Sequence, residues 1–227
     1  MAFYVTGDTH LDIDIDTRIS YLYNNNLTSN DYFIITGDVG FMWDKTKRCK
    51  YWLDWYSKQP FTTLFVDGNH ENFDYLDSLP IETWNGGEIH KLTDNVIHLT
   101  RGQVFIIDGK KFFTFGGAES LDKARRIPYV SWWAREMPSH KEYNTGLHNL
   151  HQHDNKVDYI ITHACSKNTF NLFQNEFNLN PHFTDINVYF DMLELTVDFK
   201  LWFFGHYHID KFIDLKRYAL FNKVVKF

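Results

Sequence analysis

Seven side chains that can bind metal ions follow short apolar runs of this 227-residue chain. They are Asp8, His10, Asp38, Asn69, His163, His206 and His208. Carboxylate and amide oxygens mixed with imidazoles suit Mn, Fe, Zn or Co better than Ca. Seven ligands are too many for one ion, and two ions about 3.5 to 4 Å apart that share one carboxylate can promote in-line attack on a phosphate ester. Asp38 is our candidate for the shared carboxylate.

The apolar runs that precede these ligands have the length and composition of buried strands. They cover residues 2–6, 32–36, 63–66, 159–162 and 201–204. Helical patterns at 17–25 and 45–58 alternate with the first three runs, which indicates a largely parallel sheet. Ligands in such sheets bind beyond the carboxyl ends of the strands, so we expect these side chains to converge there.

The middle and the end of the chain add further elements. Runs at 96–99, 103–108 and 111–115 predict strands, and Asp108-Gly109 is a hairpin signal between the last two. This predicts an antiparallel section. Helices are expected at 141–153 and at 186–197, the latter with Thr184 or Asp185 as its N-cap, and strands at 211–215 and 218–225.

Composition indicates one α/β domain over residues 1–227, because 44% hydrophobic and 23% charged residues are typical of globular chains and no linker divides the sequence. The net charge of −6 argues against a general nucleic-acid coat but leaves a nuclease open. Two cysteines cannot form a disulfide framework. With no export signal or membrane-length apolar segment visible, we expect a soluble cytoplasmic protein.

The ordered blocks Asp8-x-His10, Gly37-Asp38, Gly68-Asn69-His70-Glu71, a lone His163 and Gly205-His206-x-His208 resemble the calcineurin-like metallophosphoesterases. The block from Gly116 to Arg126 resembles one found in small bacterial and phage members of that family. The resemblance implies an α/β fold in which a two-sheet β-sandwich is flanked by helices. It implies that Asp8, His10 and His208 hold one metal and that Asn69, His163 and His206 hold the other, bridged by Asp38. Manganese is the first choice, with Fe, Zn, Co or Ni as alternatives.

The same resemblance assigns catalytic roles to Asp38 and His70. His70 would protonate the leaving oxygen or stabilise the phosphoryl group, and a metal-bound hydroxide would attack. The Asp and Arg that follow Gly-Asp in the serine/threonine phosphatase branch are missing here, so Asp44 and Asp67 are candidates to orient His70. Arg125 and Arg126 are candidates to bind the substrate phosphate, and Trp132-Trp133 to form an aromatic wall.

Other clusters have simpler interpretations. His140, His148, His151 and His153 are predicted to lie on a solvated helical segment. Asp12, Asp14 and Asp16 lack the glycine and glutamate of a calcium loop. Cys165, two residues beyond His163, lacks a motif that would stabilise a thiolate.

These patterns predict a metal-dependent phosphoesterase, with a phosphomonoesterase acting on phosphoprotein or nucleotide as the first choice. A phosphodiesterase or nuclease is the alternative. A scaffold without catalysis, as in the retromer subunit that resembles this family, is disfavoured because every ligand position and His70 are retained. The expected partner is a phosphate-ester substrate, with nucleic acid only as substrate and no membrane.

Overall fold

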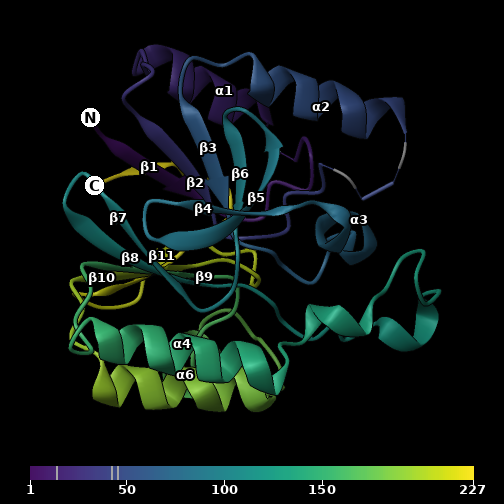
Figure 1. Ribbon diagram of the computed structural model, residues 1–227. Helices are drawn as coiled ribbons and strands as arrows, with labels where there is room; N and C mark the ends of the chain where they lie inside the picture. Colours follow the sequence, from purple (N-terminus) through teal and green to yellow (C-terminus); the bar gives the residue numbers. More distant parts are fainter. Residues whose placement is uncertain (14, 42, 45) are drawn as a thin grey trace.

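The computed structural model has two β-sheets packed face to face, with helices on both outer faces (Figure 1). It describes residues 1–13, 15–41, 43–44 and 46–227. Asp14 of the acidic run and Lys45, the predicted first residue of a helix, therefore lie outside the described residues. The predicted two-sheet α/β sandwich is confirmed.

The first sheet has the strand order β13-β1-β2-β3-β6-β5-β4. Its strands are β1 (Phe3–Thr6), β2 (Tyr32–Ile35), β3 (Thr62–Phe65), β4 (Ile81–Trp84), β5 (Gly87–Thr93), β6 (Val96–Leu99) and β13 (Val225–Lys226). Strands β1, β2, β3 and β6 are parallel, whereas β13, β5 and β4 pair antiparallel with their neighbours. The parallel alignment brings the carboxyl ends of β1, β2 and β3 to one edge.

The second sheet has the order β11-β12-β10-β9-β8-β7. Its strands are β7 (Gln103–Ile107), β8 (Lys110–Phe115), β9 (Tyr159–Thr162), β10 (Leu201–Phe204), β11 (Lys211–Phe212) and β12 (Arg217–Ala219). Strands β8, β9 and β10 are parallel. The predicted hairpin joins β7 to β8, with positive φ angles of 52° at Asp108 and 70° at Gly109, as a two-residue hairpin turn requires.

The predicted strand at 218–225 is wrong in extent, because the chain turns in its middle. Arg217–Ala219 forms β12 in the second sheet, whereas Val225–Lys226 forms β13 in the first. The Asp210 carboxylate accepts hydrogen bonds from the backbone N–H groups of Phe221, Asn222 and Lys223. These bonds stabilise a turn that carries the chain from one sheet to the other.

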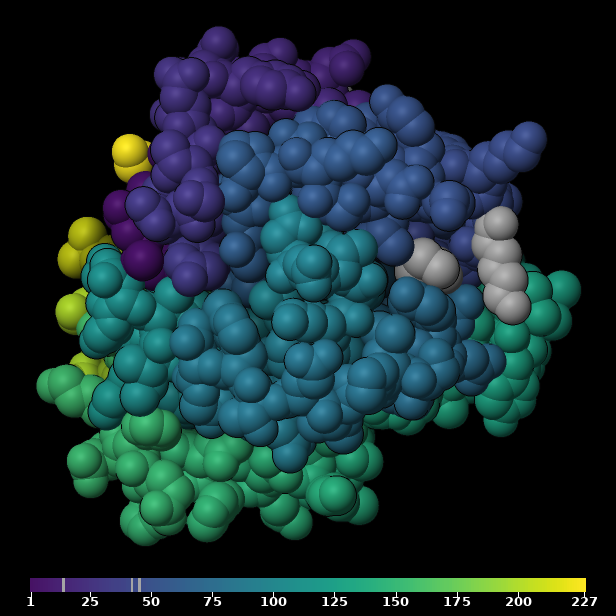
Figure 2. All heavy atoms as spheres, turned by 45° about the horizontal axis from the view of Figure 1, so that its top comes forward, coloured from purple at the N-terminus to yellow at the C-terminus, as the bar shows by residue number. Residues whose placement is uncertain are grey.

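Helices α1 (Ile15–Asn24) and α2 (Lys47–Ser57) cover the first sheet, and α4 (His140–Gln152) and α6 (Asp185–Thr196) cover the second (Figure 1). The short helices α3 (Phe73–Ser78) and α5 (Lys167–Phe173) complete the set, together with 3-10 turns at Lys123–Arg125 and Ala134–Glu136. The sequence reading missed α3, α5, β4 and β5. Figure 2 shows blue and teal segments covering the face between the purple N-terminal segment and a green segment at the bottom of the view.

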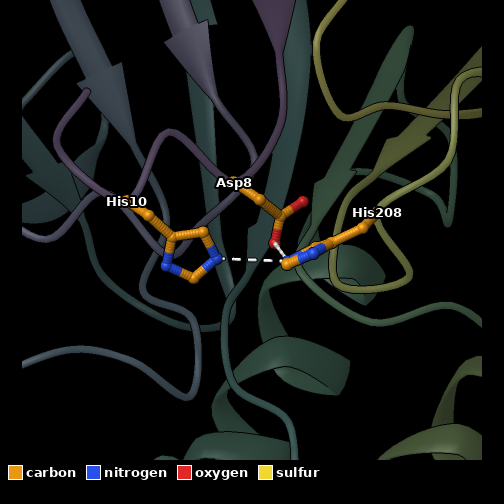
Figure 3. A group of neighbouring side chains, drawn as sticks. All are labelled: Asp8, His10 and His208. Carbon is orange, nitrogen blue, oxygen red and sulfur yellow. Dashed lines mark hydrogen bonds and ion pairs between the residues drawn. The ribbon is translucent and has the colours of Figure 1, made fainter. Parts of the chain in front are cut away.

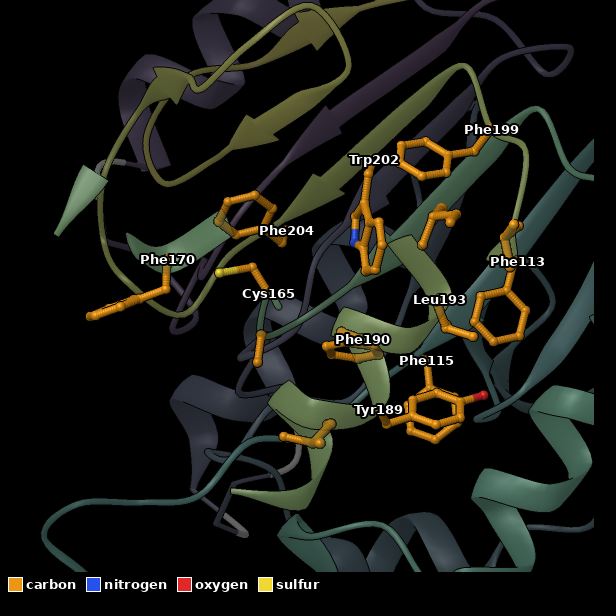
Figure 4. Close-up of a cluster of buried hydrophobic side chains, with 14 of the residues drawn as sticks. Phe113, Phe115, Cys165, Phe170, Tyr189, Phe190, Leu193, Phe199, Trp202 and Phe204 are labelled. Atoms are coloured by element: carbon orange, nitrogen blue, oxygen red, sulfur yellow. The ribbon is translucent and has the colours of Figure 1, made fainter. Parts of the chain in front are cut away.

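Three apolar layers hold the sandwich together, because successive side chains of a strand point to opposite faces. In β1, Tyr4 packs under α1 and α2, whereas Phe3 and Val5 enter the layer between the sheets. Beneath the second sheet, Phe190 and Trp202 pack edge to face with 5.5 Å between ring centroids (Figure 4). These layers fix the relative position of the two strand edges.

No helix in the described ranges is long and apolar enough to cross a lipid bilayer. Cys49 and Cys165 are both buried free thiols. Burial raises the pKa of the Cys165 thiol, which agrees with the structural role predicted for it.

Candidate metal centre

The carboxyl ends of five strands, three from the first sheet and two from the second, meet at one edge of the sandwich. Asp8 follows β1, Asp38 follows β2 and Asn69 follows β3, all on neighbouring parallel strands. His163 follows β9, and His206 and His208 follow β10. The two sheets therefore bring together side chains that are up to 200 positions apart in the sequence.

Asp8, His10 and His208 form the first group of converging ligand atoms (Figure 3). The Nε2 atoms of His10 and His208 are 3.1 Å apart, and Nε2 of His208 is 3.9 Å from Oδ1 of Asp8. Both Asp8 oxygens accept the backbone N–H of His206, at 3.0 and 2.9 Å. One ligand atom from each of the three residues lies within 4.8 Å of the others, which a single ion can span.

Asn69 and His163 present unshared electron pairs to the same space. Nδ1 of His163 lies 2.8 Å from the Thr36 carbonyl oxygen, which only accepts, so Nδ1 carries the proton. In the neutral ring, Nε2 then points its lone pair towards Oδ1 of Asn69 at 3.0 Å. Oδ1 of Asp38 lies 3.5 Å from the same nitrogen. Three acceptor atoms converging in this way match the ligand set of a cation.

Asp38 lies between the two groups. Its Oδ2 is 3.6 Å from Nε2 of His10, and its Oδ1 accepts the backbone N–H of His70 at 2.7 Å. Burial by itself raises the pKa of Asp38, but His163, His70 and His10, which attract the carboxylate when they are protonated, outweigh that effect and lower the pKa to about 2. Burial and the Asp38 charge raise the pKa of Asp8 well above its ordinary value. Two buried carboxylates therefore lie within reach of each other's charge, which divalent ions bound beside them would balance.

The backbone at this edge is strained. Among the seven predicted ligands, five non-glycine residues adopt positive φ angles, between 34° and 69°: Asp8, His10, Asp38, His206 and His208. Such conformations are costly for residues with a Cβ and cluster at functional sites. The positive φ angles turn the chain sharply at the strand ends, so that the side chains that follow different strands point towards the same space.

Gly68 allows the turn after β3 to approach the turn after β2. A Cβ at this position would collide with the carboxylate and the backbone nitrogen of Asp38. Only glycine fits at this close approach.

Comparison with protein families decides the assignment. Residues 1–210 match the family described as calcineurin-like phosphoesterase. The chain belongs to this family. A search among curated proteins finds none that matches it. Members of this family are metal-dependent phosphoester hydrolases that typically use dinuclear metal sites, and the converging ligand groups of this chain agree with that chemistry.

His70 lies next to the ligand cluster, with its ring centroid 5.2 Å from that of His10. The Arg126 nitrogens Nη1 and Nη2 lie 3.1 Å from its Nδ1 and Nε2, respectively. Because a neutral imidazole accepts through one nitrogen only, Arg126 can donate to one of them, and the other carries the ring proton. Burial lowers the pKa of His70, and the Arg126 charge adds to this effect.

Neither carboxylate predicted to orient His70 contacts it. Asp44 accepts from the Thr46 backbone N–H at 2.9 Å, near the start of α2. Asp67 faces β6 and accepts from Arg101 Nε at 2.9 Å. Two partners hold it there, because Nε2 of His98 in β6 also lies 3.2 Å from the Asp67 carboxylate. In place of a carboxylate, the guanidinium of Arg126 contacts His70.

The two arginines predicted to bind the substrate phosphate differ in exposure and in their contacts. Arg125 ends a 3-10 turn and is exposed, whereas Arg126 is half-buried, with its Nε 2.7 Å from Asp122. Of the two, only Arg126 has a described contact with His70. The predicted aromatic wall is also wrong for Trp133, which is buried edge to face against Trp43. It is Trp43 that lies near His70, with 5.6 Å between ring centroids.

Ser120 and Glu136 orient the Asn69 amide, a role that the sequence reading missed. The Ser120 hydroxyl donates to Oε2 of the buried Glu136 at 2.6 Å. Its oxygen can then accept from Nδ2 of Asn69 at 3.0 Å, which leaves Oδ1 facing His163. Glu136 lies 67 positions beyond Asn69 and follows no strand, so no spacing in the sequence indicated it.

The other predicted clusters are solvated or structural. His148 and His151 are exposed on α4. Asp12 forms an ion pair with Arg48 and also accepts from the Trp52 indole N–H at 3.3 Å. The helix residues Trp52 and Tyr56, four positions apart, both pack in the apolar layer under α2.

Proposed function

We propose that this protein hydrolyses phosphate monoesters with the help of two divalent transition-metal ions. The observation that carries the proposal is the convergence of His163 Nε2, Asn69 Oδ1 and Asp38 Oδ1, which are three acceptor atoms when the imidazole is neutral and its proton is on Nδ1. Acceptor atoms that face one another repel unless a cation lies between them. The family assignment supports the same chemistry.

The ligand set fits two ions. Asp8, His10 and His208 would hold one, Asn69, His163 and His206 would hold the other, and Asp38 would bridge them. Three oxygen donors and four imidazoles favour manganese or a related borderline metal over calcium. When bound, the ions would polarise the phosphoryl oxygens and lower the pKa of a water molecule.

His70 and Arg126 supply the rest of the proposed mechanism. The His70 backbone N–H donates to Asp38, which holds the imidazole beside the ligand cluster. The ring nitrogen that carries the proton would donate it to the leaving oxygen or stabilise charge on the phosphoryl group. The guanidinium of Arg126, anchored by Asp122, would move from the imidazole to the phosphate oxygens. An additional cation favours a dianionic monoester over a monoanionic diester.

One observation favours phosphodiester hydrolysis as the second candidate. Hollows flank the ligand cluster on two sides: His206 and His208 line one, whereas His10, His70 and Trp43 line another of about 310 Å³. A diester carries an organic group on each side of the phosphorus atom, and two hollows could accommodate both groups.

Steady-state hydrolysis of p-nitrophenyl phosphate and bis-p-nitrophenyl phosphate by the manganese-loaded protein tests the proposal. We expect the monoester to be preferred in kcat/KM. Asp38→Asn serves as the control for contaminating activity, and mass spectrometry of the metals gives the stoichiometry. Preference for the diester would select the second candidate. Less than half an equivalent of metal, with no gain on incubation with manganese, would refute the enzyme and favour a scaffold.

A further inference from the structure

The larger hollow beside the metal centre has features of a specificity pocket. It is a cavity of about 400 Å³ that reaches the predicted ligands His206 and His208. Its walls come from the segment 118–121 after β8, from Phe170 in α5, and from the loop before α6 with the first turn of that helix. Small-molecule sites start at about 300 Å³, so the cavity can hold more than a phosphate group.

The walls of this pocket offer no free positive charge to a second anionic group. Apart from the predicted ligands, its titratable lining residues are Glu119, His182 and Tyr207, and Glu119 pairs with His182 at 2.5 Å. Glu119 also forms an ion pair with Lys123. The remaining lining residues are uncharged. The part of the substrate that enters the pocket should therefore be uncharged.

Aromatic and apolar side chains form one wall. The rings of Phe170 and Tyr207 have centroids 5.3 Å apart, and Tyr207 lies 5.0 Å from the ring of His206. Leu121 and Leu179 add aliphatic surface. A flat ring next to the metal centre would find stacking surface here.

Amide side chains form the rim. Asn178 and Asn180 are both exposed and both line the cavity. Each amide offers donors and an acceptor, which suits a partner that carries both kinds of polar group along one edge. A heterocyclic base has such an edge, whereas a phenol ring has a single hydroxyl group and an alkyl chain has none.

We infer that this pocket binds the nucleoside of a nucleoside monophosphate, with its phosphate directed towards His206 and His208. The inference rests on the proposed function. Hydrolysis would break the bond between phosphorus and the ribose oxygen and form one between phosphorus and a water oxygen. The products are the nucleoside, whose hydroxyl gains a proton, and inorganic phosphate.

Comparison of kcat/KM for different monoesters tests the inference. We expect kcat/KM of the manganese-loaded protein to be at least about tenfold higher for adenosine monophosphate than for glycerol phosphate, the scale of discrimination that apolar pocket contacts provide. Leu121→Trp, which places bulk at the mouth, should remove most of that preference. Leu195→Trp is the matched control. Leu195 on α6 is about as exposed as Leu121, at 83% against 72%, but it does not line the cavity.

Calorimetric titration of adenosine into the metal-free protein gives a readout that does not depend on turnover. The variant Asn178→Gly with Asn180→Ala should weaken adenosine binding about tenfold, as expected for the loss of two hydrogen bonds. Glycine is chosen at 178 because Asn178 has a φ of 52°. Asn175→Ala removes a nearby exposed amide outside the cavity and should leave binding unchanged.

The outcomes separate the two proposals. Metal-dependent hydrolysis of glycerol phosphate with no preference for the nucleotide, or preference for a phosphotyrosine peptide, would overturn the pocket inference and leave the proposed function intact. Equal effects of Leu121→Trp and Leu195→Trp would also overturn it. No hydrolysis of any ester by the metal-loaded protein would overturn both.

Discussion

Asp38 and Asp67 are buried carboxylates that both lie beside histidines, but their negative charges are balanced differently. Asp38 is 2% exposed and shares its surroundings with a second buried carboxylate, Asp8. Asp67 is 1% exposed and forms a buried ion pair with Arg101. The charge of Asp67 is balanced by the buried guanidinium of Arg101, whereas Asp38 lies beside a second buried carboxylate and raises its pKa.

The histidines of the two regions differ in the same way. Near Asp67, Nε2 of His98 lies 3.2 Å from the carboxylate, and Nδ1 of His98 lies 3.1 Å from Nδ1 of His90. The three side chains form a chain of hydrogen-bonding groups. Near Asp38, Nε2 of His163 faces oxygen acceptors. The Asp67 cluster also has none of the positive φ angles found at the metal centre. A buried carboxylate with imidazoles is thus insufficient evidence for a metal site. A second buried carboxylate and a strained backbone distinguish the metal centre from the Asp67 cluster.

Replacement of Asp38 should have the largest effect on metal content and activity. Asp38→Asn should remove both ions and lower kcat/KM for p-nitrophenyl phosphate by at least about 10⁴-fold, since the ions together would supply several kcal/mol of stabilisation to the transition state. Metal analysis and steady-state kinetics check this expectation. A variant that keeps two equivalents of metal would show that Asp38 does not bridge them.

The same substitution at one histidine of each region compares their contributions to kcat. His70→Asn should keep the metal and lower kcat by about 10²- to 10⁴-fold, the range for loss of a general acid. His98→Asn makes the same substitution in the Asp67 cluster and should leave kcat within about twofold when the protein is folded. Metal loss in His70→Asn equal to that in Asp38→Asn would refute the role assigned to His70.

Asp67→Asn should destabilise the metal-free protein by about 3 kcal/mol, because it leaves Arg101 without its buried partner. Although burial raises the pKa of Asp67, Arg101 and His98 outweigh it and hold the pKa far below its ordinary value. Asp67 therefore contributes stability above the unfolded-state pKa of about 3.9, and this contribution is lost as the pH falls towards the folded pKa.

Urea unfolding of both proteins in chelator, between pH 7 and pH 3, measures this contribution. The difference in free energy of unfolding between the wild type and Asp67→Asn should be constant down to about pH 5 and shrink below it. A difference that grows in acid would contradict the assignment. Metal stoichiometry of the folded variant should stay at the wild-type value.

The smallest expected effect concerns the orientation of Asn69. Ser120→Ala should weaken binding of one ion about 10- to 100-fold, the usual cost of losing a hydrogen bond to a ligand, and leave the other ion in place. Manganese titration followed by electron paramagnetic resonance can resolve the two sites. Ser131→Ala, at a serine whose hydroxyl accepts the Ile127 N–H, is the matched control. Equal weakening by both variants would count against a role for Ser120.

The sequence by itself determined the strands that precede the predicted ligands. The runs at 159–162 and 201–204 are strands with those bounds, and His163 and His206 follow them directly. This succeeds because buried parallel strands read as short apolar runs, and their carboxyl ends coincide with the positions where polar residues begin. The Asp108-Gly109 hairpin is equally local, since its turn is set by two residues.

Only the tertiary structure decided which side chains support the ligands. Asp67 was predicted to orient His70, but the side chain faces Arg101, 34 positions away. Arg125 and Arg126 are adjacent in the sequence, and the direction of a 3-10 turn places only the second against His70. Glu136 orients Asn69 through Ser120 across a gap of 67 positions. Such contacts depend on side-chain direction and on the packing of distant loops, which no local pattern of residue types encodes.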